Sequence, residues 1–124
     1  MQSIELSQIA GMRFPNGRYT RLVTGQQGLP AKGFVQGYVV MPPGSGVAEH
    51  DHHQEEIYLF LSGRGEIRVG EETTEVAGGS AVYIQCGVKH ALRNTGAEDL
   101  VMVFSYAPSG EVGHWKEELA GRLK

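Results

Sequence analysis

The 124-residue sequence has a single cysteine, five prolines and no hydrophobic run long enough to span a membrane. The lone Cys86 excludes an intrachain disulfide and is compatible with a reducing compartment. The formal net charge of −3 gives no electrostatic reason to bind nucleic acid or an anionic membrane surface. The N-terminus does not show the charged start followed by an apolar stretch that is typical of a signal peptide. We therefore expect a cytoplasmic protein with neither nucleic acid nor a membrane as its partner.

Glycine, in contrast, is abundant, with 18 residues and no repeating triplet. So many glycines beside so few prolines indicate frequent tight turns, as an all-β chain requires. Hydrophobic residues make up 40% and charged residues 20%, which are ordinary values for a globular protein. The length predicts one domain over residues 1–124, with an N-terminal arm at about 1–14.

The most informative stretch runs from Gly44 to Gly63 and places His50, His52 and Glu56 within seven residues. If residues 48–60 are extended, alternation points both histidines to one face, and Glu56 could join them from the following strand of an antiparallel hairpin. Imidazole and carboxylate ligands together suit a divalent transition metal better than calcium or magnesium. This stretch predicts three ligands of a metal site, with a fourth elsewhere.

A second stretch, from Gly79 to Asn94, supplies His90 as the best candidate for that ligand. The strand Ala81–Ile84 leads through a turn at residues 85–87 into a second strand that carries His90. The two stretches resemble the paired motifs of the cupin superfamily. The first motif consists of glycine, His-x-His, glutamate and glycine, and the second of glycine, Pro-x-Gly, histidine and asparagine. Nine of the ten fixed positions match, and the departure is Gln85 at the proline position.

This resemblance implies an all-β fold, a cupin-type antiparallel β-barrel or jelly roll with the metal inside. It also implies the ligand set, which is His50, His52, Glu56 and His90. The cofactor is expected to be one divalent metal ion per chain, with Mn, Fe, Ni and Zn all open. Losing the proline at Gln85 loosens a turn but removes no ligand.

Such a site predicts a small-molecule ligand. About two positions of an octahedral metal would stay open for a molecule with adjacent oxygens. Two hypotheses follow: an enzyme acting on an oxygen-rich molecule, as a dioxygenase or as a lyase, isomerase or decarboxylase, or a non-catalytic binding or sensing module. Glu56 could also take a proton during turnover, as a catalytic residue. The expected pocket-lining aromatics are Tyr58, Phe60, Tyr38 and Phe104.

The strand from Ile57 to Ser62 is apolar on both faces. With Glu56 facing inward, Tyr58 and Phe60 face inward too, and Ile57, Leu59 and Leu61 face outward. An apolar outer face needs a cover, which favours a homodimer.

The tail predicts an amphipathic helix at about residues 111–123, packed on the outside of the barrel. Trp115, Leu119 and Leu123 recur at four-residue spacing, whereas Glu118 falls elsewhere on the helical wheel.

Other polar residues have ordinary interpretations. His53 is expected to point away from the metal, and Gln54 and Glu55 to be surface or hinge residues, with Glu55 a second-choice ligand if the strand register slips by one. Asn94 is expected to brace a strand end. A lone cysteine such as Cys86 is expected to be buried and inert. A solvated surface charge is expected for Arg13, Arg18, Arg21 and Lys89, although each could meet an anionic substrate.

Overall fold

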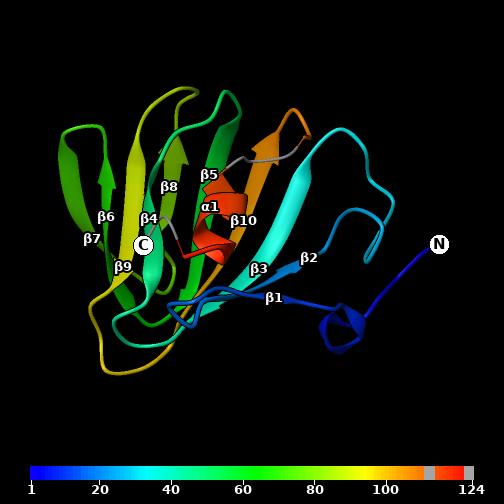
Figure 1. Cartoon of the computed structure of the whole chain (residues 1–124), viewed down its shortest axis with the longest axis horizontal. Coiled ribbons are helices and arrows are strands. Elements are labelled where there is room, and N and C mark those ends of the chain that lie inside the picture. Colours follow the sequence, from blue (N-terminus) through cyan, green and yellow to red (C-terminus); the bar gives the residue numbers. More distant parts are fainter. Residues whose placement is uncertain (111–113, 122–124) are drawn as a thin grey trace.

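A computed structural model describes residues 1–110 and 114–121 of the chain and shows two β-sheets packed face to face (Figure 1). The strands are β1 (Met12–Arg13), β2 (Tyr19–Leu22), β3 (Val35–Met41), β4 (Gly46–His50), β5 (Glu55–Ser62), β6 (Arg64–Val69), β7 (Glu72–Ala77), β8 (Ala81–Ile84), β9 (His90–Asn94) and β10 (Leu100–Ala107). The helical elements are the 3-10 turn η1 (Leu6–Gln8) and the helix α1 (His114–Leu119). The fold class is therefore all-β, of the jelly-roll type, as the sequence predicts.

The two sheets interleave segments that are distant in the chain. One sheet has six strands in the order β1-β2-β3-β10-β5-β8, and the other has four in the order β4-β9-β6-β7. The neighbouring strands pair antiparallel. Strand β5 lies between β10 and β8, whereas β4 pairs with β9. Consecutive strands such as β4 and β5 thus face each other across the core.

Strand β5 shows the alternation that the sequence predicts. Tyr58 and Phe60 are buried between the sheets, whereas Ile57, Leu59 and Leu61 are each 43–48% exposed on the outer face. The inward side chains join one hydrophobic core with others from both sheets, including Met41, Val47, Ile67, Ile84, Leu92, Leu100 and Met102. At about 25 cal/mol per Å² of apolar area removed from water, this core supplies the main driving force for folding.

Gly63 shows why the first motif ends in glycine. Its φ of 89° lies in the left-handed region, and a Cβ there would overlap the carbonyl oxygen of Asp99. This turn between β5 and β6 carries the chain from the six-stranded sheet to the four-stranded sheet.

The predicted hairpin between the histidines and Glu56 is wrong. Strand β4 ends at His50, β5 begins at Glu55, and the two belong to different sheets. The intervening residues cross from one sheet to the other, so residues 48–60 are not one extended segment. Alternation is a local property, whereas strand pairing is decided by non-local partners.

The C-terminal helix is correctly predicted in kind, but its buried face differs. Within the described residues α1 covers His114–Leu119, and Leu123 lies outside them. Leu119 is 45% exposed, whereas Glu118 is buried. Trp115 packs edge-on against Phe104 and lines an internal cavity, so α1 contributes to the interior rather than packing on the outside. No helix among the described residues is both long and apolar enough to cross a membrane.

Candidate metal centre

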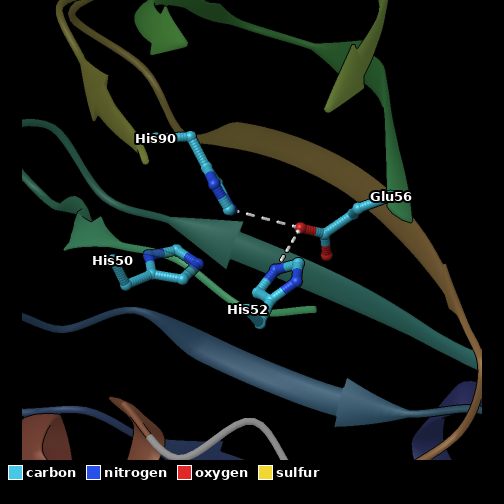
Figure 2. A group of neighbouring side chains, drawn as sticks. All are labelled: His50, His52, Glu56 and His90. Carbon is cyan, nitrogen blue, oxygen red and sulfur yellow. Dashed lines mark hydrogen bonds and ion pairs between the residues drawn. The ribbon is translucent and has the colours of Figure 1, made fainter. Parts of the chain in front are cut away.

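Three imidazoles and one carboxylate converge between the two sheets. His50, His52, Glu56 and His90 each offer one ligand atom, and these atoms all lie within 4.8 Å of one another. Figure 2 shows the rings pointing toward the Glu56 carboxylate, which approaches from the opposite side. The structure thus brings together the four residues that the motifs single out, and this cluster could hold a metal ion.

The strand pairing explains this convergence. His50 at the end of β4 lies directly opposite His90 at the start of β9, so these two imidazoles come from adjacent strands of the four-stranded sheet. Glu56 comes from β5 in the facing six-stranded sheet, next to Tyr106 of β10 and Ile84 of β8. Both sheets therefore contribute to the cluster.

His52 lies in the crossing segment between the sheets rather than in a strand. Its carbonyl oxygen accepts a hydrogen bond of 2.8 Å from the backbone N–H of Gly87, in the turn of the second motif. Gly87 has a φ of 76°, a conformation that glycine adopts without strain. This bond ties the second motif to the first, even though Gln85 replaces the usual proline of the turn.

The ring nitrogens are oriented by the backbone. The Nδ1 atoms of His50, His52 and His90 lie 2.7, 3.0 and 2.9 Å from the carbonyl oxygens of Ala48, Gln54 and Val88. A carbonyl oxygen can only accept, so each Nδ1 carries the proton and donates. In a neutral ring the Nε2 then bears a lone pair, which is the form that ligates a metal.

The Glu56 carboxylate is ionised beside these rings. Its Oε1 lies 3.1 Å from His52 Nε2 and 3.3 Å from His90 Nε2. Burial raises the pKa of Glu56, but the hydrogen bond with His52 and the nearby His52 and His90 rings outweigh burial, and the net pKa is lowered. Burial likewise lowers the pKa of His52, but the hydrogen bond to Glu56 and its charge prevail and raise the pKa. The two shifts have one cause, which is the contact of 3.1 Å between His52 Nε2 and Glu56 Oε1.

The cluster fits a bound divalent ion. The Nε2 of buried His90 has no aligned hydrogen-bond partner among the described residues, although it lies near Glu56. A buried polar atom without a partner is costly, and a metal ion would satisfy it together with the other donors. Three nitrogens and one oxygen match the ligand preferences of Mn, Fe, Ni and Zn better than those of calcium or magnesium.

A small cavity adjoins the cluster. Its volume is about 20 Å³, which is room for about one water molecule. Of the four aromatics expected in a substrate pocket, Tyr58 and Phe104 line this cavity. Phe60 is fully buried in the core, and Tyr38 is half-buried on β3, where the neighbouring Val39 lines the cavity instead. By alternation the Tyr38 side chain faces away from the cavity.

The largest correction concerns Arg18, which is not a surface charge. It is only 2% exposed, lines the cavity and forms an ion pair with Glu118 of α1, at 2.6 Å from Nη1 to Oε2. Sequence reasoning missed this pair because its two members lie 100 residues apart. Neither residue carries a local signal of burial, so only the three-dimensional structure reveals the pair.

Two further expectations are wrong. Cys86 is exposed rather than buried. Gln54 is buried rather than at the surface, and its side-chain amide has no hydrogen-bond partner among the described residues. His53 is exposed, as expected, and Glu55 is an exposed acceptor for the hydroxyl of Tyr83.

Asn94 braces the end of β9, as expected. Its Nδ2 donates to the carbonyl oxygens of Met41 and Glu98, at 2.8 and 2.7 Å, and its Oδ1 accepts from the backbone N–H of Gly96. The last residue of the second motif therefore holds the loop between β9 and β10 against the end of β3.

Comparisons with known proteins agree with this geometry. The family model described as "Cupin domain" matches residues 37–106. An uncharacterised protein of Streptomyces coelicolor is 33% identical over 109 residues, covering 87% of this chain and 97% of the relative. The polyketide synthase protein CurC of Streptomyces cyaneus is 30% identical over 115 residues, covering 90% of this chain and 74% of the relative.

Solved structures show the same fold. A protein from Thermotoga maritima, described as a predicted oxalate decarboxylase, superposes with a TM-score of 0.78 at 23% identity and covers 87% of this chain and all of its own. An RmlC-like cupin from Shewanella frigidimarina gives a TM-score of 0.77 at 11% identity, covering 90% of this chain and 94% of its own. At these identities the likeness concerns the fold alone.

Proposed function

The chain belongs to the cupin family, and from this membership we propose that it is a metal-dependent enzyme acting on a small oxygen-rich molecule. The observation that carries the proposal is the donor set. Three imidazoles have Nδ1 committed to backbone carbonyls and Nε2 directed at the ionised Glu56. His50, His52, Glu56 and His90 would hold the ion. When bound, a divalent metal would act as a Lewis acid toward a chelating substrate.

The side chains beside the cluster suit a polar substrate in an otherwise apolar cavity. Burial and the charge of Glu56 raise the pKa of Tyr58 well above its ordinary value, so its hydroxyl stays protonated and can donate a hydrogen bond. Phe104 and Tyr106, stacked with ring centroids 5.8 Å apart, form an apolar wall that excludes water. Tyr58 thus orients an oxygen of the substrate, and the wall shields the reacting atoms.

The relatives support an oxygen-rich substrate without identifying it. CurC is described as a polyketide synthase protein, and polyketides carry repeated carbonyl groups. Such molecules have closely spaced oxygens, which can chelate one metal ion.

A non-catalytic binding or sensing module is the second candidate, and the small cavity favours it. A space of about 20 Å³ does not admit an organic substrate in this conformation. A site that holds the ion and stays closed would bind metal without turnover.

Two measurements separate the candidates. Elemental analysis of protein purified without chelator should show about one transition-metal ion per chain. Protein loaded with Fe(II) is then incubated with diketones, catechols and uronates, with oxygen consumption and substrate loss recorded, and His52→Ala as the control. Turnover that requires His52 supports the enzyme. Bound metal with no turnover of any compound favours the binding module, and protein without metal overturns both.

A further inference from the structure

Arg18, which lines the cavity beside the cluster, forms a buried, two-pronged ion pair with Glu118 of α1. The Nη1 and Nη2 atoms of Arg18 donate to the two carboxylate oxygens of Glu118, at 2.6 and 2.9 Å. Both residues are only 2% exposed. A planar guanidinium facing both oxygens of a carboxylate is the arrangement by which proteins recognise carboxylate ligands.

Arg18 shares its cavity with the metal cluster. The same small space is lined by Arg18, His50, Glu56 and Tyr58. The charges of Glu56, Arg18 and Glu118 all affect the pKa of the buried Tyr58 hydroxyl, which lines the same space. A ligand bound at the cluster would therefore extend toward the guanidinium.

Arg18 is held in place independently of Glu118. Its Nη1 also donates to the carbonyl oxygen of Gly46 at 2.8 Å, and its Cζ lies 3.8 Å from the centre of the Phe14 ring. This stacking and hydrogen bonding fix the guanidinium from the β-sandwich side. The arginine would therefore keep its position if its carboxylate partner were exchanged.

Glu118, in contrast, belongs to a short element with few buried side chains. Among the described residues of the six-residue α1, Glu118 is buried and Trp115 half-buried, while Lys116, Glu117 and Leu119 are exposed. A buried ion pair adds little net stability because desolvation opposes the attraction. If a ligand carboxylate replaced that of Glu118, Arg18 would still have an anionic partner, and the released Glu118 would be hydrated by solvent.

We propose that Arg18 anchors a carboxylate group of the ligand, and that Glu118 occupies this position when no ligand is bound. The ligand is then a small organic acid that offers chelating oxygens to the cluster and a further carboxylate to Arg18. The inference rests on the proposed metal site and narrows its substrate class. Entry of the ligand displaces Glu118, and with it the part of α1 that closes the cavity.

Matched hydroxy acids test this assignment. Lactate presents an α-hydroxy acid, and malate and 2-hydroxyglutarate add a second carboxylate one or two methylenes away. Affinities are measured by calorimetry on Ni(II)-loaded protein, with metal content determined on each sample. We expect at least one of the dicarboxylates to bind about tenfold or more tightly than lactate, which corresponds to about 1.4 kcal/mol.

Three variants assign the preference to residues. Arg18→Met should abolish the preference, so that the dicarboxylates bind this variant no more tightly than lactate binds it. Glu118→Gln removes the competing charge and should strengthen dicarboxylate binding about tenfold with little effect on lactate. Glu117→Gln changes the net charge equally on an exposed neighbour and should change neither affinity. If Arg18→Met does not fold, Arg18→Met/Glu118→Leu removes both charges together.

The outcomes are distinguishable. Metal-loaded protein that binds all three acids equally, or a dicarboxylate preference that survives Arg18→Met, overturns the anchor and leaves the metal site standing. Glu118→Gln without effect on dicarboxylate affinity overturns the role of Glu118 as an occupant. Protein that takes up no Ni(II) overturns the proposed function and the anchor together.

Discussion

The Nε2 atom of His90 lies 3.3 Å from the Oε1 atom of Glu56, although the two residues belong to opposite sheets of the sandwich. A metal ion bound between them would join the two sheets across the core. Ion binding should therefore stabilise the fold as well as supply chemistry, because a site assembled from distant segments exists only in the folded chain.

The first prediction follows from this link. His52→Ala removes a direct donor to the ion. Losing the hydrogen-bond partner behind a metal ligand costs roughly 10- to 100-fold in metal affinity, so losing the ligand itself should cost more. In the presence of metal it should also lower the melting temperature. For metal at about 100 times Kd, the stabilisation lost is about 2.7 kcal/mol, or roughly 10 °C. Elemental analysis and calorimetric melting measure the two effects.

His53→Ala is the matched control for this variant. His53 is the adjacent histidine but is exposed and outside the cluster, so its removal should leave metal content and melting temperature unchanged. Equal metal content in wild type and His52→Ala would contradict the ligand assignment.

The second prediction concerns pH and has opposite signs with and without metal. Without metal, the raised pKa of His52 gives stability that is present below about 6.5 and lost as the pH rises through its folded-state pKa. The lowered pKa of Glu56 gives stability that is present above about 4.5 and lost as the pH falls through its folded-state pKa. The metal-free protein should therefore gain most from this pair between about pH 4.5 and 6.5.

With metal, the slope on the alkaline side should reverse. Imidazoles must be deprotonated to bind the ion, so the stabilisation by metal grows as the pH rises through the range of His titration. Melting temperatures recorded between pH 5 and 8, with EDTA and with excess Zn(II), measure the difference. Two parallel curves would contradict binding of the ion through the imidazoles.

The third prediction concerns assembly. Ile57, Leu59, Leu61 and Tyr83 are exposed on β5 and β8, on the outer face of the six-stranded sheet. An apolar face of this kind is a common interface, and we expect a homodimer formed through it. Leu59→Lys should shift the mass measured by light scattering from dimer to monomer. Thr74 is exposed on β7 of the other sheet, so the control variant Thr74→Lys should remain dimeric. A monomeric wild type would contradict the proposed interface.

The sequence is informative where function imposes a fixed spacing. The motif positions of His50, His52, Glu56 and His90 locate the cluster because donors to one ion must converge. The alternation in β5 separates its inward and outward faces because a strand has a period of two. These patterns are visible without knowledge of the strand pairing.

The remaining features depend on contacts between distant segments. The sheets to which β4 and β5 belong are set by β9 and β10, which no pattern within residues 46–62 reveals. Likewise, buried Arg18 pairs with Glu118 from the far end of the chain, and the helical periodicity of the tail suggested the wrong buried face. A buried charge is tolerated only with a partner, and here that partner lies 100 residues away.

The fourth prediction separates a structural motif residue from a ligand. Asn94→Ala removes three hydrogen bonds, leaving the carbonyl oxygens of Met41 and Glu98 and the N–H of Gly96 without this partner. Unsatisfied buried groups cost about 1–3 kcal/mol each, and partial access to water at two of these bonds reduces the sum to about 2–4 kcal/mol. The free energy of unfolding, from urea titration of the metal-free protein, should fall by this amount. Metal affinity measured well below the melting temperature should stay within about threefold of wild type, because Asn94 contributes no atom to the cluster.

His52→Ala should behave in the opposite way, with metal affinity lost and the metal-free stability changed less. A loss of metal affinity in Asn94→Ala as large as that in His52→Ala would mean that Asn94 also controls the position of His90, four residues earlier in β9.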